Sequence, residues 1–217
     1  MTDYATRRTM MVDTQIRPSD VTKFPIISAM LSVPRENFVP RDKREAAYMG
    51  ANIDLGDNRT ILDPRTFAKI LDALDIQPTD FVLDIGMGYG YSAAVLSQLG
   101  EAVVAIEDDQ TRFGEASEAL GDFGADNVIP HLSGLAEGAA EHGPYDIILI
   151  QGAVEYVPDS VLSQLKDGGK IACLFAEGSF GTVKIGYKFG GRLDWRASFN
   201  AGAPILNGFE KHRDFTL

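Results

Sequence analysis

The stretch FVLDIGMGYGYSAAVLSQLG, residues 81–100, decides the fold. It begins with a short apolar run that ends in Asp84, continues with glycines at alternate positions (Gly86, Gly88 and Gly90), and passes into a helical pattern of apolar residues. Glycine suits a sharp turn from strand to helix because it adopts positive φ and has no Cβ. In open α/β sheets the crevice beyond the carboxyl ends of the strands is the usual ligand site. The stretch therefore predicts a buried strand, a ligand-binding turn and a helix.

Strand and helix patterns alternate along the rest of the C-terminal part. Apolar runs typical of buried strands lie at residues 102–107, 127–132, 145–152 and 170–175. Helical patterns separate them, including one at residues 158–169 that a Gly pair ends. Such alternation is typical of a parallel sheet covered on both faces. Residues 182–189 and 193–199 flank a Gly-Gly turn, which predicts a hairpin. We therefore predict a doubly wound, mostly parallel α/β fold with an antiparallel C-terminal strand.

The N-terminal third has a different pattern. Short helical segments are interrupted by prolines, and Asp20 is an N-cap candidate for the helix that follows it. Residues 51–64 are polar and contain Gly and Asn, which predicts a loop. We expect one domain over residues 1–217, with a helical extension and acceptor loop at 1–75 and an α/β core at 76–217.

Composition narrows the class of protein. The net charge of −11 argues against a nucleic-acid partner, because phosphate binding needs clustered Lys and Arg. The single cysteine, Cys173, lies in an apolar run and is expected to be buried. No apolar run approaches the roughly 20 residues of a membrane span, and no signal peptide is recognisable. These features predict a cytoplasmic protein with no membrane partner and no metal, and they leave the oligomeric state open.

The glycine turn differs from a dinucleotide site. The third position of the G-x-G-x-x-G fingerprint is Tyr91, and Asp84 stands where a carboxylate would repel a pyrophosphate. An acid there suits a ligand with a cation, such as an ammonium or sulfonium. Glu107 ends the next strand and can accept hydrogen bonds from ribose hydroxyls. The ordered set predicts S-adenosylmethionine (SAM) as cofactor, although each acid alone could be solvated or cap a helix. An NAD-linked oxidoreductase is a distant alternative.

Several segments resemble protein-L-isoaspartate O-methyltransferases. The resemblance rests on residues 82–100, on VPRENFVP at 33–40, on 47–64 and on 145–171, and it extends from about residue 10 to about residue 175. It implies the Rossmann-like fold of SAM-dependent methyltransferases and methyl transfer to isoaspartyl residues of damaged proteins or peptides. The cofactor-binding residues that it implies are Asp84, Gly86, Met87, Gly88, Gly90, Tyr91, Glu107, Asp108 and Gln151.

The chain departs from that family at the acceptor loop. The family reads Thr-Ile-Ser, one residue and Pro, and the corresponding positions here begin with Thr60 and continue through Leu62 and Asp63. Leucine cannot bind a carboxylate as the family serine does. The family's Gly-Asp-Gly is replaced by Ser133, Gly134 and Leu135, and its threonine after the later strand is Gln151. We take Thr60, Leu62 and Asp63 as the candidate acceptor residues.

The chemistry leaves three functions open. A carboxylate acceptor is already an anion and needs no general base, so catalysis can rest on positioning and on exclusion of water. Asp63 could instead act as a base toward a small-molecule hydroxyl or amine, or only cap the next helix. Arg59 or Arg65 could supply positive charge for a carboxylate. A non-catalytic SAM-binding protein is the third reading.

The remaining candidate side chains fit ordinary structural roles. His131, His142 and His212 are interpreted as surface or strand-end residues. Trp195 is interpreted as a core aromatic, with an acceptor pocket as the alternative.

Overall fold

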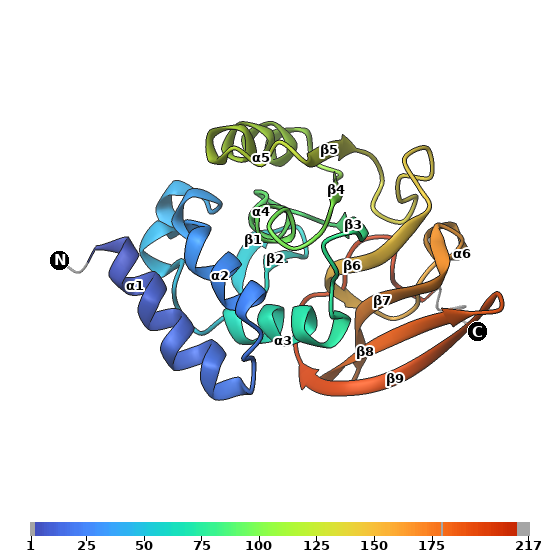
Figure 1. The fold of residues 1–217 in the computed structure, drawn as a ribbon. Helices are drawn as coiled ribbons and strands as arrows, with labels where there is room; N and C mark the ends of the chain where they lie inside the picture. Colours follow the sequence, from blue (N-terminus) through green and yellow to red (C-terminus); the bar gives the residue numbers. More distant parts are fainter. Residues whose placement is uncertain (1–2, 179, 212–217) are drawn as a thin grey trace, which may run out of the picture.

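The computed structural model describes residues 3–178 and 180–211 and contains a seven-stranded sheet (Figure 1). The strand order is β5-β4-β3-β6-β7-β8-β9. The strands are β3 (Phe81–Ile85), β4 (Ala102–Glu107), β5 (Val128–Leu132), β6 (Tyr145–Val154), β7 (Leu165–Glu177), β8 (Phe180–Phe189) and β9 (Arg192–Ala201). From β5 to β7 neighbouring strands are parallel, whereas β8 is antiparallel to β7 and β9 to β8. This confirms the predicted α/β fold and its antiparallel end.

The order of the strands places a ligand crevice at the end of β3. The chain runs from β3 outward through β4 and β5 and then returns to β6 on the other side of β3. Such a reversal opens a crevice at the carboxyl ends of the strands. In the register Asp84 lies beside Ala105 of β4 and Leu149 of β6. The acids that end β3 and β4 are therefore close neighbours.

The two faces of the sheet are covered differently. One face packs against helices that share one large apolar cluster: α1 (Tyr4–Met11), α2 (Phe24–Ser32), α3 (Pro64–Leu74), α4 (Tyr91–Leu96) and α5 (Gln110–Phe123). The other face packs against α6 (Asp159–Leu162), the β5–β6 loop and the segment after β9, whose Leu206 and Phe209 are fully buried. Alternation along the strands explains both clusters, since Val82 faces the first and Leu83 the second.

The N-terminal third contains several short turns of helix. They are η1 (Val12–Ile16, a π-helix) and three 3₁₀ segments, η2 (Arg17–Ser19), η3 (Arg35–Asn37) and η4 (Arg41–Ala46). The expectation that Asp20 caps the next helix is wrong. Asp20 ends η2 in a left-handed conformation with φ of 65°, and Lys23 precedes α2 without a side-chain cap.

Two further expectations are corrected. Residues 51–64 contain a hairpin of β1 (Ile53–Gly56) and β2 (Arg59–Ile61) and not only a loop. Its tip carries Asp57 and Asn58 at φ of 51° and 58°, the backbone that suits a tight two-residue turn. The helix expected over residues 158–169 is limited to α6, because β7 begins at Leu165.

Cys173 is buried, as expected. Trp195 is half-buried at the edge of the second apolar cluster and not in the core, where it packs edge-to-face on Phe175 with ring centroids 4.9 Å apart. Among the described residues, no helix is both long and apolar enough to cross a membrane.

Candidate active site

The glycine turn joins β3 to α4 as predicted. Gly86, Gly88 and Gly90 have φ of 86°, 59° and 93°, which residues with a side chain rarely adopt. The N–H groups of Gly86 and Met87 both donate to the carbonyl of Ile106 at 2.9 Å, which ties the turn to the end of β4. Backbone and acids from two neighbouring strands therefore meet at one point.

Asp84 is fully buried and has neutral partners. Its carboxylate accepts hydrogen bonds from Ser92 Oγ at 2.5 Å and from Gln151 Nε2 at 2.7 Å. Burial raises the pKa of Asp84 to about 6, while the two hydrogen bonds and the charge of Arg59 oppose this rise. Above that pH the site holds a buried negative charge that makes no direct ion pair with any described residue.

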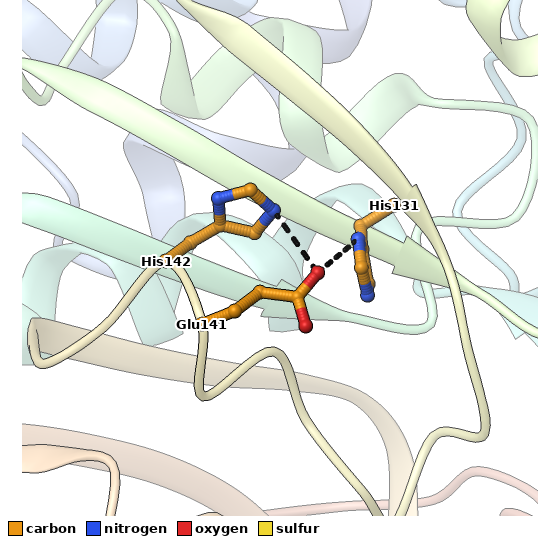
Figure 2. Close-up of side chains that lie close together, drawn as sticks. All are labelled: His131, Glu141 and His142. Atoms are coloured by element: carbon orange, nitrogen blue, oxygen red, sulfur yellow. Dashed lines mark ion pairs between the residues drawn. The ribbon is translucent and has the colours of Figure 1, made fainter.

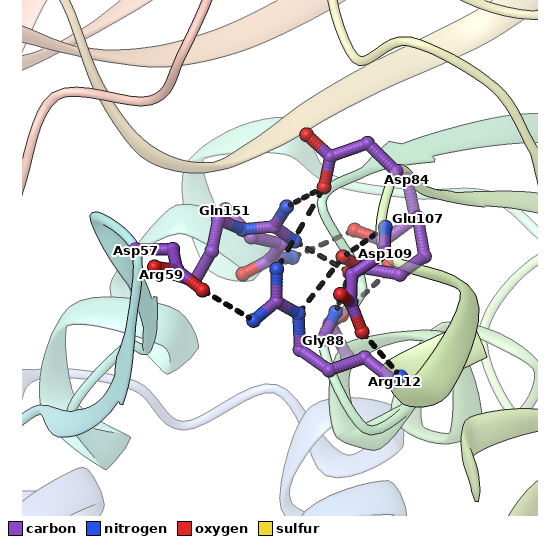
Figure 3. Close-up of polar contacts among 10 residues, drawn as sticks. Asp57, Arg59, Asp84, Gly88, Glu107, Asp109, Arg112 and Gln151 are labelled. Atoms are coloured by element: carbon purple, nitrogen blue, oxygen red, sulfur yellow. Dashed lines mark hydrogen bonds and ion pairs between the residues drawn. The ribbon is translucent and has the colours of Figure 1, made fainter. Parts of the chain in front are cut away.

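Glu107 is equally buried, but its partners are cationic (Figure 3). Oε2 accepts from Arg59 Nη2 at 2.6 Å and from the N–H of Gly88 at 2.9 Å. Oε1 accepts from Arg112 Nε at 3.1 Å and from the N–H of Asp109 at 3.3 Å. Burial raises the pKa of Glu107, and the two guanidiniums oppose the rise. A carboxylate has about four acceptor sites, so those of Glu107 are filled.

Arg59 comes from strand β2 of the hairpin and reaches into the crevice. Its side chain is 2% exposed, and it bridges Glu107 and Asp108, with Nη1 2.9 Å from Asp108 Oδ1. Its Nε has no hydrogen-bond partner within the described part of the chain. A Cβ added at Gly86 would lie 3.1 Å from Arg59 Nη2, so the guanidinium rests directly on the glycine turn.

Two leucines complete the cover over the turn. Leu55 of β1 lies 2.9 Å from the position that a Cβ on Gly88 would take. A Cβ added at Gly86 would lie 3.7 Å from Leu206. A Cβ added at Gly152 would lie only 2.6 Å from the same leucine, so only glycine fits at position 152. The cavity beside Gly86 and Met87 measures only about 10 Å³. Ligand pockets usually measure roughly 300–1,000 Å³.

The expected site residues thus gather at the crevice, but the crevice is closed. Asp84, Glu107 and the glycines lie together as the sequence predicts. In this conformation Arg59 occupies Glu107, the residue that the sequence suggests as the acceptor for ribose hydroxyls. Gln151 is bound to Asp84, and Asp108 to Arg59. Tyr91 is buried with Arg35 Cζ 4.4 Å from its ring centroid, and its hydroxyl lacks a partner among the residues described.

The acceptor-loop candidates have structural partners. Thr60 Oγ1 donates to the Ile53 carbonyl at 3.0 Å across the hairpin. Leu62 is 2% exposed and belongs to the core, although it also borders the space beside Gly86. Asp63 accepts from the N–H of Thr66 at 3.0 Å and caps α3. The capping interpretation of Asp63 is therefore confirmed, and Arg65 is exposed on the first turn of α3.

Away from the crevice, one group of side chains has the composition of a metal site. His131 of β5 and His142 lie on either side of Glu141, each with a ring nitrogen 3.7 Å from Glu141 Oε1 (Figure 2). The sequence interpretation treated the histidines separately and missed this group, because His131 and His142 are distant in the chain. His212 lies outside the described residues.

Comparison with known proteins gives the family. The family model of Protein-L-isoaspartate(D-aspartate) O-methyltransferase (PCMT) matches residues 6–179. The chain belongs to this family. A protein-L-isoaspartate O-methyltransferase of Roseiflexus castenholzii is 35% identical over 169 residues, which are 78% of this chain and 77% of the relative. One of Koribacter versatilis is 32% identical over 193 residues, which are 89% of this chain and 87% of the relative.

Solved structures of PCMT proteins have the same fold. A protein-L-isoaspartate O-methyltransferase superposes with a TM-score of 0.80 at 24% identity, covering 93% of this chain and 66% of that one. A PCMT from Plasmodium falciparum, solved with S-adenosyl-L-homocysteine, superposes with a TM-score of 0.79 at 16% identity. The match covers 95% of this chain and 99% of that one. PCMT proteins are SAM-dependent methyltransferases, so the family resemblance seen in the sequence is confirmed.

One local pattern in the sequence is compatible with the β1–β2 hairpin. Asp57 and Asn58 are turn-forming residues, and Arg59, Thr60 and Ile61 follow them directly. A turn followed by such residues is compatible with a short strand. The contact of the C-terminal tail with β6 has no such pattern. Pro204 and Leu206 follow the last strand, and no local feature of the sequence indicates that they lie beside the end of β6. The carbonyl of Pro204 accepts from the N–H of Ala153 at 2.8 Å, a contact over 51 positions of sequence that only the fold provides.

Proposed function

We propose that this chain is a SAM-dependent methyltransferase that acts on the carboxylate of isoaspartyl residues in proteins or peptides. The observation that carries the proposal is Asp84, a buried carboxylate with neutral partners at the tip of β3, beside a glycine turn. A buried anion without a cation of its own favours a positively charged ligand. Family membership and the relatives named above support the same activity.

The acids and glycines of the crevice have the chemical properties that SAM requires. Asp84 would hold its cationic end, Gly86 and Gly88 would lie against it, and Glu107 would bind its ribose. When bound, SAM supplies a methyl group on a sulfonium, which is already an activated leaving group. Because an isoaspartyl carboxylate is an anion near neutral pH, the chain needs no general base. Its task is to align the two reactants and to exclude water.

The cover over the crevice suits that task. Leu55, Leu206 and the aliphatic part of Arg59 are apolar groups that would keep water from the reacting atoms. The acceptor would approach through the hairpin, where Thr60 and the backbone around Leu62 border the remaining space. Cofactor and acceptor can enter only if this cover moves.

A second acceptor class has specific support. Leu62 is buried where the family has a serine, and Asp63 is engaged as a helix cap, so neither offers a hydrogen bond to an isoaspartyl carboxylate. A less polar small molecule would fit such a loop better.

The single-domain organisation, the cytoplasmic location and the absence of a nucleic-acid partner stay predictions from the sequence.

The test is methyl transfer from labelled SAM. An isoaspartyl peptide and the same peptide with a normal aspartyl residue serve as substrate and control, alongside a panel of small carboxylic acids, alcohols and amines. The proposal predicts label in the isoaspartyl peptide only. Label confined to a small molecule would favour the second acceptor class, and binding of S-adenosylhomocysteine without any transfer would favour a non-catalytic protein.

A further inference from the structure

We propose that Arg59 is a latch that competes with the cofactor for Glu107, so that SAM binding requires the β1–β2 hairpin to release this arginine. The inference rests on the proposed function, since it assumes that Glu107 binds the cofactor. It goes beyond that function because it names Arg59 of the hairpin as a residue that controls the affinity for the cofactor.

The first argument is the saturation of Glu107. Its four acceptor positions are filled by Arg59, Arg112 and the N–H groups of Gly88 and Asp109. The two backbone donors belong to the turn and to the start of α5, and they cannot leave without unfolding either. A hydroxyl can therefore reach Glu107 only if a guanidinium withdraws.

The second argument identifies which guanidinium withdraws. Arg112 lies on α5, a helix of 14 residues that packs on the sheet. Arg59 lies on a two-stranded hairpin that is not part of the seven-stranded sheet. Its tip is exposed, and its side chains meet the tail through a hydrogen bond of 3.3 Å from Asn58 Nδ2 to Asn207 Oδ1. Ile53 and Ile61 of the hairpin are buried in the same apolar cluster as Leu120 of α5, so the part that can move is the exposed tip together with the Arg59 side chain.

The third argument is that Arg59 is imperfectly satisfied. Its Nη1 and Nη2 are paired, but its Nε is buried without an acceptor in the described structure. An unsatisfied buried donor is unfavourable, so the latched state is held less strongly than two ion pairs alone would suggest. Such a latch can be displaced by a ligand that satisfies Glu107 and brings its own charge to Asp84.

The test compares S-adenosylhomocysteine affinities by calorimetry for wild type and three variants. Arg59→Met removes the charge but keeps an apolar side chain, Arg59→Ala removes both, and Arg17→Gln changes an exposed arginine as the control. If about nine-tenths of the molecules are latched, the Met and Ala variants bind about tenfold more tightly, and the control binds as wild type. Unfolding curves identify any variant that does not fold. In that case Arg59→Lys, which keeps the positive charge, is measured instead, and its gain in affinity is expected to be smaller than tenfold.

Two results would overturn the latch. Equal or weaker binding by both Arg59→Met and Arg59→Ala, with a wild type that binds normally, would mean that Arg59 is neutral or is itself a cofactor ligand, and the proposed function would survive. Binding by neither the wild type nor any variant would remove the proposed function and the latch together.

A separate observation carries a second inference: we infer that His131, Glu141 and His142 bind a divalent transition metal such as Zn²⁺. Their ligand atoms all lie within 4.8 Å of one another, and the two N···O distances are 3.7 Å. Tetrahedral Zn²⁺ with bonds near 2.0–2.2 Å separates neighbouring ligand atoms by about 3.4 Å. Each histidine–glutamate pair therefore needs to contract by only a few tenths of an ångström, and the two histidine nitrogens, which lie within 4.8 Å of each other, by at most about 1.4 Å.

The position gives such a site a role. His131 belongs to β5, at the edge of the sheet, and Glu141 and His142 belong to the loop that leads to β6. The loop covers one face of the sheet through the buried Leu135 and Ala139. A metal would fasten it to the edge strand, and imidazole with one carboxylate is a suitable donor set for Zn²⁺, leaving one position for water.

Titration with Zn²⁺ and with Co²⁺, whose visible absorption reports tetrahedral coordination, tests this inference. We expect one equivalent bound and a raised unfolding temperature. His131→Ala and Glu141→Gln should each weaken binding at least about tenfold, as the loss of a ligand does, whereas Glu115→Gln, an exposed acid elsewhere, should not. Absence of binding, or equal binding by wild type and His131→Ala, would overturn it.

Discussion

Asp84 and Glu107 are acids at the tips of adjacent strands, both fully buried, and yet their surroundings differ in charge. Asp84 is held by a serine and a glutamine, whereas Glu107 is held by two arginines and two backbone N–H groups. Within the described structure Glu107 is therefore neutralised by direct ion pairs, whereas Asp84 makes no direct ion pair. This difference indicates which end of the crevice needs a positively charged ligand and which end is already occupied.

The largest effect is expected from removing the charge of Glu107. Glu107→Gln leaves Arg59 and Arg112 without their shared anion in a buried site and turns an amide N–H toward one of them. Breaking a buried ion pair costs about 3–5 kcal/mol, so the free energy of unfolding should fall by that amount. Urea unfolding at pH 7.5 measures it. Glu101→Gln, an exposed glutamate at the other end of β4, is the control and should change little.

The opposite sign is expected for Asp84. Burial raises the pKa of Asp84 from its ordinary value of 3.8 to about 6, so the folded state binds the proton more tightly than the unfolded state does. The corresponding stability is present below pH 3.8 and is lost as pH rises through 6. Asp84→Asn, which avoids the buried charge, should exceed wild type by up to about 3 kcal/mol at pH 7.5 and match it near pH 4. Unfolding across this range measures the difference, and a variant less stable at pH 7.5 would contradict it.

The glycine turn between the two acids is expected to be essential for the ligand. Gly88→Val introduces a branched side chain at φ of 59° and against Leu55. S-adenosylhomocysteine affinity should fall by about a hundredfold, equivalent to roughly 2.7 kcal/mol. Gly121→Val is the control, because a Cβ there meets nothing within 4 Å. Unchanged affinity in the folded Gly88→Val protein would remove the turn from the site.

The smallest effect is expected at the acceptor loop. Leu62→Ser restores the hydroxyl that the family carries and should raise transfer to an isoaspartyl peptide by a few-fold, about 1 kcal/mol. Because Leu62 is buried, the same change should lower stability by about 2–4 kcal/mol, so rates must be compared at a temperature where the variant is folded. No gain in rate would mean that Leu62 does not limit this activity.

The parts of the fold that follow local rules could be predicted from the sequence. Apolar runs gave the parallel strands, and the glycines after Asp84 gave the turn, because periodicity and backbone freedom are local properties. The sequence also placed Asp84 and Glu107 together, since acids at the ends of parallel strands meet at one edge. What it could not give is the partner of each acid.

Those partners depend on contacts between distant segments. Arg59 meets Glu107 across 48 positions, and Gln151 meets Asp84 across 67. A charged residue in a polar segment is usually exposed, so the burial of Arg59 is invisible until its anions are known. For the same reason local sequence predicts neither the hairpin at residues 51–64 nor the contact of the tail after β9 with the crevice.

The most direct test of this account is a crystal structure with S-adenosylhomocysteine. We predict that the nucleoside lies at the tips of β3 and β4, with its amino group toward Asp84 and its ribose on Glu107, and that Arg59 has moved away from that carboxylate. A structure in which Arg59 still contacts Glu107 while the nucleoside lies elsewhere would contradict it.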